Sequence, residues 1–335
     1  MSAAGKEPRN GTRASVACGL AILIIALAAA GCRPNEKTAA EKETLQGNIS
    51  ISASFALYPL ILKMADEFHK IHPGLRFDIS AVGAAKSISD TLNGLADLGG
   101  LSRQVHPQEK DRGLWAASVA RDAVLAVISE DNPYLPGLMR VGARKDVLAR
   151  LWMEGGVRTW GDLTGDASAS QPVHAYIRAD PCGAGEIWAQ FLGGQQEDLK
   201  GTGVHGDSWM AGAVKKDPLG IGYANLNFAY DASTLAPAAG IRILPLDINE
   251  NGRVDPEEDF YSTRPQLLGA IASLSYPSPP ARDLYLICRG IPPRRAVREF
   301  VIWSLTQGQA LVPETGYIPL PEPMLKDALR DLASR

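Results

Sequence analysis

Apolar residues recur with two different periods along this chain. Residues 58–71 have the period of a helix, and one face of that helix is apolar, formed by Ile61, Met64, Ala65, Phe68 and Ile71. In residues 75–81 every second position is apolar instead, which predicts a strand with one buried face. The pattern therefore predicts both helices and strands within the first hundred residues.

The same two patterns continue towards the C-terminus. Further strands are predicted at residues 48–52, 96–101, 120–129, 173–178 and 283–288. Further helices are predicted at residues 87–93, 146–153, 265–273 and 295–305. Strands that alternate with helices are typical of an α/β fold, and we expect a largely parallel sheet with helices as the crossovers.

The first 32 residues have the pattern of a secretory leader. Three basic residues precede an apolar run at residues 14–30, which ends in small residues and Cys32. Gly31-Cys32 resembles a lipobox, which predicts a signal peptide at residues 1–32 and a lipidated Cys32 as the first residue of the mature protein. A plain cleaved leader and a short membrane anchor are the alternatives. Residues 33–46 are polar and aperiodic, as expected of a flexible tether.

The composition is that of an ordinary globular protein. The 335 residues carry a formal net charge of −3, and charged residues of both signs are mixed along the chain. There is no basic excess to attract nucleic acid, so we expect no nucleic-acid partner. Beyond the leader the sequence contains only Cys182 and Cys288, which form either a disulfide or two small buried thiols.

Three predicted strands run into very small residues and then into a predicted helix. These turns are Ser52-Ala53-Ser54, Gly83-Ala84-Ala85 and Cys182-Gly183-Ala184. Small residues let a ligand approach the backbone N–H groups, and a helix N-terminus favours an anion. Arg103 and Arg178 lie close to these turns in sequence, and an arginine offers an oxyanion a charged fork. The sequence therefore predicts a site that binds a small oxyanion.

Residues 247–258 match the twelve-residue calcium loop of EF-hands. The predicted ligands are Asp247, Asn249, Asn251, the carbonyl oxygen of Arg253, Asp255 and Glu258, with Gly252 at the sharp turn. The flanks depart from the motif, because residues 240–246 look extended and a helix follows only at residues 265–273. We expect one structural calcium ion in this loop, and a solvated turn is the alternative.

Several short motifs occur in an order that is found in one known family. They are Ser52-Ala53-Ser54, Ile71-His72-Pro73, Val82-Gly83-Ala84-Ala85, Leu101-Ser102-Arg103, Thr159-Trp160-Gly161-Asp162-Leu163, Gly220-Ile221-Gly222-Tyr223 and Gly316-Tyr317-Ile318-Pro319-Leu320. Over residues 48–320 the chain resembles the PstS-like phosphate-binding proteins of bacterial ABC transporters, a branch of the periplasmic solute-binding proteins.

The resemblance implies a type II periplasmic binding protein, in which two α/β lobes are joined by two hinge crossings and the ligand lies in the cleft between them. We place the crossings near residues 121–126 and 277–283. Lobe 1 would then comprise residues 47–122 and 281–335, and lobe 2 residues 123–280, which include the calcium loop. Lobes of this kind close around a ligand by hinge motion.

The family's ligand residues carry over only where this sequence matches. The resemblance implies a site made of Ser52, Ser54, Phe55, Gly83, Ala84, Ser102, Arg103, Arg178, Cys182, Gly183 and Ala184. In two turns the chain departs from the family, with Gly83-Ala84-Ala85 in place of Gly-Ser-Gly and Cys182-Gly183-Ala184 in place of Ser-Gly-Thr. Hydroxyl donors are lost at both turns, and only backbone N–H groups can replace them.

Phosphate carries a proton at neutral pH, so a selective site also needs an acceptor. Asp97, Asp180 and Glu186 are the candidates, and an ordinary role in a cap, a turn or a first helical turn is the alternative for each.

The resemblance implies a periplasmic or cell-surface lipoprotein that binds phosphate and delivers it to the permease subunits of an ABC importer. A different small oxyanion or polar metabolite, and a calcium-stabilised phosphate sensor or surface protein, are the alternatives. An enzyme is disfavoured, because the five histidines are scattered and no Gly-x-Ser-x-Gly motif occurs.

Overall fold

A computed structural model of the chain describes residues 45–333. The predicted signal peptide, with Cys32, and nearly all of the predicted tether lie outside the described residues. Within residues 45–333, no helix is both long enough and apolar enough to cross a membrane.

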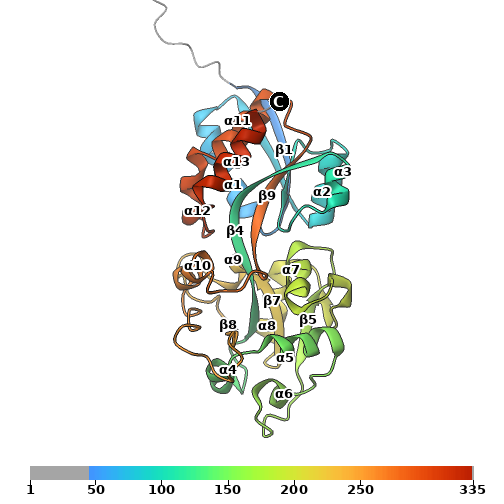
Figure 1. The fold of residues 1–335 in the computed structure, drawn as a ribbon, viewed down its shortest axis with the longest axis vertical. Coiled ribbons are helices and arrows are strands. Elements are labelled where there is room, and N and C mark those ends of the chain that lie inside the picture. The colour runs from blue at the N-terminus through green and yellow to red at the C-terminus, as the bar shows by residue number, and fades with distance from the viewer. Residues whose placement is uncertain (1–44, 334–335) are drawn as a thin grey trace, which may run out of the picture. The chain divides into compact units, whose positions relative to one another are not determined.

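Two strands link the two lobes of the described chain. They are β4 (Leu114–Ser129) and β9 (Ala281–Arg289), which lie side by side in Figure 1. β4 pairs with β9 as far as Ala123 and with β7 (Gly220–Asn225) from Val124 onward, so it passes from one lobe to the other at this point. Both this change of partner and the start of β9 fall within the segments where the crossings were expected.

Lobe 1 is built on the parallel strands β1 (Gly47–Ser54), β2 (Leu75–Val82) and β3 (Leu98–Leu101). Its helices are α1 (Tyr58–Ile71), α2 (Ala84–Leu92), α3 (Pro107–Asp111), α11 (Arg295–Ser304), α12 (Leu311–Glu314) and α13 (Glu322–Ala333). Helix α1 has the predicted bounds and buries the predicted face, except that Ile71 at its last position is 51% exposed.

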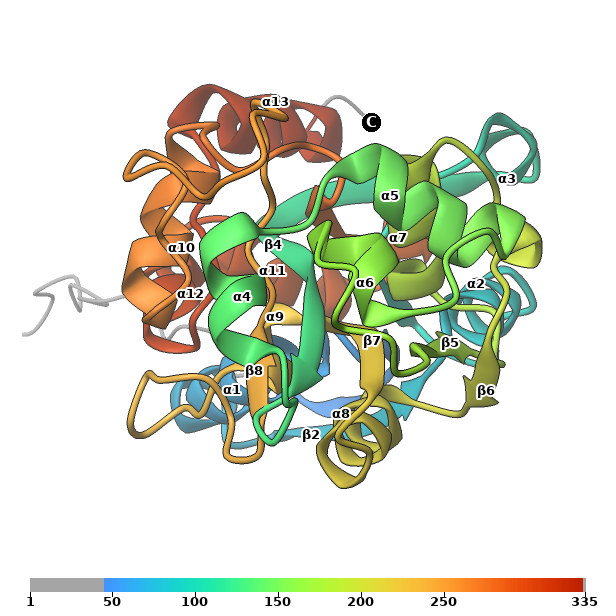
Figure 2. The ribbon, with the colours of Figure 1, turned by 90° about the horizontal axis from the view of Figure 1, so that it is seen from below.

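Lobe 2 contains β5 (His174–Arg178), β6 (Thr202–Val204), β7 and β8 (Ile241–Ile243). Its α-helices are α4 (Leu135–Val141), α5 (Lys145–Ala149), α6 (Trp160–Thr164), α7 (Gly183–Leu192), α8 (Asp207–Lys216), α9 (Leu226–Ala229) and α10 (Arg264–Ala272). A π-helical turn, Arg150–Glu154, continues α5, so the predicted helix at residues 146–153 changes type halfway. Helices α4 and α6 lie at the end of this lobe that faces away from lobe 1 (Figures 1 and 2).

The sheet is mixed, and the prediction of a largely parallel sheet was wrong. The strand order is β2-β1-β3-β9-β4-β7-β5-β6, with β8 also paired to β4. The outer strands of each lobe pair in parallel, whereas all four pairings made by β4 and β9 are antiparallel. The crossing strands meet neighbours that are distant in sequence and run the opposite way, and local periodicity does not encode such a pairing.

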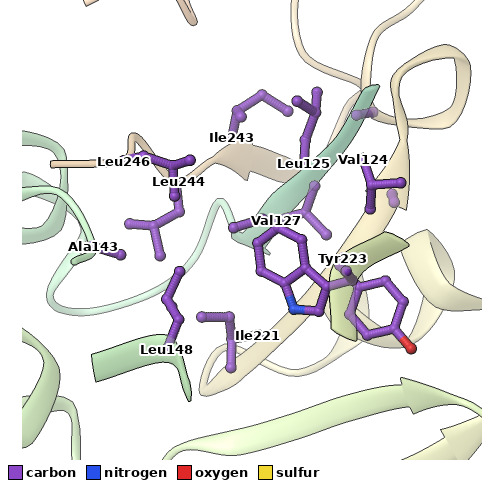
Figure 3. Packing of buried hydrophobic residues seen from close by; sticks show 14 of the residues in the cluster. Val124, Leu125, Val127, Ala143, Leu148, Ile221, Tyr223, Ile243, Leu244 and Leu246 are labelled. Atoms are coloured by element: carbon purple, nitrogen blue, oxygen red, sulfur yellow. The ribbon is translucent and has the colours of Figure 1, made fainter. Parts of the chain in front are cut away.

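Each lobe has an apolar core of its own. In lobe 2 the rings of Trp188 and Tyr223 stack with their centroids 5.7 Å apart, and Trp152 packs edge-on against Trp188. Figure 3 shows Tyr223 of this core among aliphatic residues from β4, β7 and β8. In lobe 1, Phe68 of α1 packs against Phe300 of α11, with centroids 5.3 Å apart. Cores that are separate in the two lobes, with two strands joining the lobes, suit lobes that move as bodies about a hinge.

Candidate functional site

A small cavity lies between the lobes where the three small-residue turns meet. Its volume is about 10 Å³ with the lobes as they stand, so an anion larger than a water molecule needs the lobes slightly farther apart. Nine of the eleven predicted ligand residues line it, namely Ser54, Phe55, Gly83, Ala84, Ser102, Arg178, Cys182, Gly183 and Ala184. The carboxyl ends of β1, β2, β3 and β5 lead to this cavity, which is the usual place for a ligand in an open α/β sheet. We call it the anion cavity.

The two lobes touch each other directly beside the anion cavity. Gly183 at the start of α7 lies against Ser102 of lobe 1, so that a Cβ atom at position 183 would come within 2.3 Å of Ser102 Oγ. A Cβ atom at Gly83 would likewise come within 2.9 Å of the carbonyl oxygen of Pro181. Side chains at these two glycines would hold the lobes apart, and the structure therefore shows the lobes closed.

Three buried polar atoms of the cavity lining have no hydrogen-bond partner within the described residues. They are Ser54 Oγ, Asp207 Oδ2 and Arg178 Nη1, and the last of these is still in an ion pair with Asp207 Oδ1 at 3.0 Å. Buried polar atoms are normally paired, because leaving one unpaired costs about 1 to 3 kcal/mol. A hydroxyl group, a guanidinium N–H and a carboxylate oxygen in one cavity can together bind an oxyanion that carries a proton.

Arg178 is held in place at the end of β5. Its side chain is 1% exposed and donates two hydrogen bonds to Asp180, from Nε to Oδ1 at 2.8 Å and from Nη2 to Oδ2 at 2.5 Å. Nη1 lies 3.0 Å from Asp207 Oδ1, and the guanidinium carbon lies 5.7 Å from the centroid of the Phe55 ring. Burial opposes the charge, but the neighbouring carboxylates outweigh burial and raise the pKa of Arg178. The guanidinium group is therefore a permanent cation at the cavity.

Asp207 is the site residue that the sequence analysis missed. It opens α8 directly after Gly206, which has a φ of 80°, and its side chain is 2% exposed. Asn225 Nδ2 donates a hydrogen bond to Oδ1 at 2.8 Å. Burial raises the pKa of Asp207, although Arg178 acts in the opposite direction. A signal was present in the sequence, because Gly206 lies between β6 and α8, which makes this a fourth short passage from a strand to a helix.

A chain of buried polar groups connects Asp207 to the two crossing strands. Asn225 accepts a hydrogen bond from Arg282 Nη2, and Arg282 Nε donates to Asp122 Oδ1 at 2.8 Å. Asp122 lies on β4 and Arg282 on β9. Burial raises the pKa of Asp122 against the attraction of Arg282. The anion cavity and the hinge strands therefore share one polar network.

Two predicted ligand residues lie away from the anion cavity. Ser52 Oγ donates a hydrogen bond to Asp90 Oδ2 at 2.7 Å inside lobe 1. Arg103 binds Glu109 through Nη1 and Nη2, and its Nε lies 2.8 Å from Glu186 Oε2. Ser52 has its acidic partner on another element of lobe 1, and Arg103 has one of its partners, Glu186, in the other lobe. Matching short motifs in the sequence does not reveal such partners.

None of the three predicted acceptors lines the anion cavity. They are engaged with arginines instead, Asp180 with Arg178, Asp97 with Arg294 and Glu186 with Arg103. The carboxylate that does line the cavity is that of Asp207.

Cys182 and Cys288 are both free, buried thiols. Cys182 caps α7, and its Sγ accepts a hydrogen bond from the Gly185 N–H at 3.4 Å. Burial raises the pKa of each thiol to about 11. Both groups are therefore protonated at neutral pH and are poor nucleophiles.

The loop at residues 247–258 folds around its own carboxylates. Asp247 accepts two backbone N–H groups, at 2.8 and 3.1 Å, and Glu258 accepts three, at 2.9, 2.9 and 3.2 Å. Both side chains are buried, and none of the ion pairs within residues 45–333 involves either of them. In this part of the chain, no three His, Cys, Asp or Glu side chains stand together as a preformed metal cluster.

Comparisons with known proteins agree with this architecture. A family model described as a PBP superfamily domain matches residues 38–307. The phosphate-binding protein PstS of Pseudomonas aeruginosa is 26% identical over 305 residues, which cover 86% of this chain and 88% of that protein. PstS of Staphylococcus haemolyticus is 22% identical over 294 residues, 86% of each chain. The structure of an ABC-type phosphate transport receptor from Vibrio cholerae matches with a TM-score of 0.60 at 17% identity, covering 82% of this chain and 100% of that one. With two lobes, two crossing strands and a family match over most of its length, this chain belongs to the PBP superfamily and has the type II periplasmic-binding-protein fold.

Proposed function

We propose that this chain is the extracytoplasmic solute-binding protein of an ABC importer and that it binds inorganic phosphate. The observation that carries the proposal is the anion cavity between the lobes, which brings together Ser54 Oγ and Asp207 Oδ2, neither of them hydrogen-bonded within residues 45–333, and Arg178 Nη1, whose contact is its ion pair with Asp207 Oδ1. The relatives named above support it, since they are phosphate-binding proteins and a phosphate transport receptor. The role is to bind phosphate and to release it to a permease, and it requires no catalytic group.

Asp207 gives the cavity a means to distinguish protonated from unprotonated oxyanions. Phosphate carries at least one proton near neutral pH, whereas sulfate carries none. A carboxylate oxygen accepts a hydrogen bond from the phosphate proton, but it repels an oxyanion that has no hydrogen to donate. Ser54 and Arg178 supply donors for the other oxygens, and the bond from the arginine is charge-assisted. We therefore expect the site to bind phosphate and to reject sulfate.

Isothermal titration calorimetry tests this proposal on the full chain after bound anions have been removed. We expect binding heat with phosphate and none with sulfate or nitrate. Asp207→Asn should reduce the preference for phosphate over sulfate at least tenfold, because an amide nitrogen donates where the carboxylate accepts. Heat with another oxyanion or a polar metabolite, and none with phosphate, would refute phosphate as the ligand.

We also propose that the loop at residues 247–258 binds one structural calcium ion. Asp247 and Glu258 are buried carboxylates without a cationic partner in the described chain, and a cation in the loop would balance their charge. The side chains of Asn249, Asn251 and Asp255 and the carbonyl group of Arg253 add the oxygen ligands that calcium prefers. The ion would tie the connection between β8 and α10 into a fixed loop.

Melting curves of the full chain with and without EGTA test the calcium proposal. We expect EGTA to lower the melting temperature of the wild type and to have no effect on Glu258→Gln. Glu257→Gln is the matched control, because Glu257 is the neighbouring exposed acid and is not a predicted ligand. Identical wild-type curves in calcium and in EGTA would contradict the proposal.

The proposed site of action is the outer surface of a membrane, where lipid on Cys32 would hold the protein next to the permease subunits. This part of the proposal is supported only by the leader and lipobox pattern of residues 1–32. Metabolic labelling with a fatty-acid analogue should mark the wild-type chain and leave Cys32→Ser unlabelled. Equal labelling of the two chains would contradict lipidation at Cys32.

A further inference from the structure

The buried polar network beside the anion cavity holds more carboxylates than arginines. The charged groups that act on one another there are the carboxylates Asp122, Asp180 and Asp207 and the arginines Arg178 and Arg282. Three negative charges thus meet two positive ones, a formal excess of −1. Like charges close together disfavour ionisation, so an oxyanion with two negative charges that enters the cavity favours the uptake of a proton by this network.

Two of the three carboxylates are fully engaged by an arginine. Arg282 donates to both oxygens of Asp122, from Nε at 2.8 Å and from Nη2 at 3.2 Å. Arg178 donates to both oxygens of Asp180, at 2.8 and 2.5 Å. A proton on any of these oxygens would displace a charge-assisted hydrogen bond. Neither Asp122 nor Asp180 is therefore a favourable place for it, although burial raises the pKa of Asp122.

Asp207 is the carboxylate that has an unpartnered oxygen, and Asn225 determines which one it is. A guanidinium group only donates, so Arg282 Nη2 donates to the side-chain oxygen of Asn225. The Nδ2 group of Asn225 then points to Asp207 and donates to Oδ1 at 2.8 Å, and Arg178 Nη1 lies 3.0 Å from the same oxygen. Oδ2 has no hydrogen-bond partner within residues 45–333, and Asp207 lines the anion cavity. The free place for a proton is therefore Oδ2, at the cavity.

We propose that Asp207 is a proton-dependent specificity switch, which selects protonated oxyanions as a carboxylate and admits a fully deprotonated oxyanion such as sulfate when Oδ2 carries a proton from the solvent. The switch depends on the anion-binding function proposed above. In the first state Oδ2 accepts a hydrogen bond from the ligand, and in the second its O–H group donates one to an oxygen of the anion. The proton also removes the excess negative charge of the network, which leaves two carboxylates opposite two arginines.

A fall in pH below neutral populates the second state. Burial raises the pKa of Asp207, although the charges of Arg178 and Arg282 act in the opposite direction. Cys182, which lines the same cavity, has a pKa of about 11 and stays protonated throughout this range. Sulfate keeps both of its charges in mild acid, so a change in its binding reports on the protein and not on the ligand.

Calorimetric titration of the full chain with sulfate, at neutral pH and at about pH 5, tests the switch after bound anions have been removed. We expect the wild type to bind sulfate at least tenfold more tightly at the lower pH. Titrations in two buffers with different enthalpies of ionisation should show the uptake of about one proton for each sulfate bound.

Asp207→Asn should bind sulfate equally well at both pH values and without proton uptake. Asn225 donates to the oxygen of the new amide as it does to Oδ1, so the amide N–H group takes the place of Oδ2 at the cavity. Asp90→Asn is the matched control, because Asp90 is a buried carboxylate paired with Lys86 and lies outside the cavity lining. It should retain the pH dependence of the wild type.

The outcomes separate the switch from phosphate binding itself. If the wild type binds phosphate at neutral pH and binds no sulfate at about pH 5, the switch is refuted and phosphate binding stands. If neither anion binds at either pH, both proposals fall. Sulfate binding without proton uptake in the wild type, or sulfate binding that remains dependent on pH in Asp207→Asn, would also overturn the switch, because Asp207 would then not carry the proton.

Discussion

Arg178 and Arg103 have the same kind of partners, but these partners come from different parts of the molecule. Each arginine is bound by two carboxylates, Arg178 by Asp180 and Asp207, and Arg103 by Glu109 and Glu186. Both partners of Arg178 come from its own lobe, and Arg178 lines the anion cavity with Nη1 in an ion pair but in no hydrogen bond. Arg103 takes one partner from lobe 1 and the other from α7 of lobe 2. Arg178, with both carboxylates from its own lobe, lines the anion cavity, whereas Arg103, with one carboxylate from each lobe, joins the two lobes.

Solvent exposure separates the two regions as well. The side chain of Arg178 is 1% exposed, whereas Arg103 is 8% exposed and its cross-lobe partner Glu186 is 20% exposed. Glu186 also binds His106 Nε2 at 2.9 Å, again across the lobes. An ion pair that water can reach is cheaper to break than a buried one. This suits a contact that has to open each time a ligand leaves.

Arg178→Ala should have the largest effect, because it leaves Asp180 and Asp207 as carboxylates in a buried region without their cation. Breaking a buried ion pair from one side costs about 3 to 5 kcal/mol. We therefore expect the free energy of unfolding to fall by about that amount, measured by urea denaturation. We also expect no binding heat with phosphate, because the charged donor is gone.

Arg144→Ala is the control for this variant, since Arg144 and its partner Asp146 form an exposed pair, 43% and 49% exposed. Its free energy of unfolding should change by less than about 1 kcal/mol, and its phosphate binding should be normal. If Arg178→Ala binds phosphate normally, the ligand does not contact Arg178. The proposed difference between Arg178 as a ligand residue and Arg103 as a link between the lobes would then be wrong.

Glu186→Gln should have a smaller effect, on closure rather than on the anion cavity. It removes the charge that joins α7 to Arg103 and His106 across the lobes. A loss of about 1 to 2 kcal/mol from the closed state corresponds to a fall in phosphate affinity of about five- to thirtyfold. We expect most of this loss as faster dissociation, which stopped-flow measurements with a fluorescent reporter would detect.

Glu109→Gln is the matched control, because Glu109 binds the same guanidinium group at 2.6 Å from within lobe 1. It should lower the free energy of unfolding and leave the dissociation rate of phosphate unchanged. An equal acceleration in both variants would show that the bridge between the lobes does not govern release.

Features that depend on neighbouring residues were predictable from the sequence. Helix α1 begins at Tyr58 and ends at Ile71 as predicted, because its apolar period and the proline in its first turn are local signals. The start of β4 was not predictable, since the strand begins at Leu114 and its first residues pair with β9, far away in sequence. The antiparallel centre of the sheet was missed for the same reason.

In the anion cavity, too, the local features were predictable from the sequence and the contacts between distant residues were not. The small-residue turns were recognised because their spacing is local, and residues from all three line one cavity. The side-chain partners were not recognisable, because Ser52 is engaged by Asp90 and Asp207 by Asn225, each of them on another element. The sequence shows which residues are able to bind an anion, and packing decides which of them have atoms left for it.

Asp207 and Asp180, the two carboxylate partners of Arg178, should contribute to stability with opposite pH dependence. We expect this effect to be smaller than the two above. Burial raises the pKa of Asp207 above its value in the unfolded chain. The stability that such a group contributes is complete below its unfolded pKa and is lost as the pH rises through its folded pKa. Without phosphate, Asp207→Asn should therefore melt above the wild type at neutral pH. The difference should disappear as the pH falls to about 4, near the ordinary pKa of aspartate.

Asp180→Asn should show the opposite sign. Burial is the largest single effect and opposes ionisation here too, but the hydrogen bonds and charge of Arg178 and the Gly206 N–H together outweigh it and lower the pKa of Asp180. Its contribution to stability is present above the unfolded pKa and is lost as the pH falls through the folded pKa, so this variant should melt below the wild type at neutral pH and approach it in acid. Melting curves of both variants between neutral pH and about pH 3 measure the two trends. If both variants shift in the same direction at neutral pH, Asp207 is no more than a second ion-pair partner of Arg178, and the Arg178 region loses the acceptor that sets it apart from the Arg103 region.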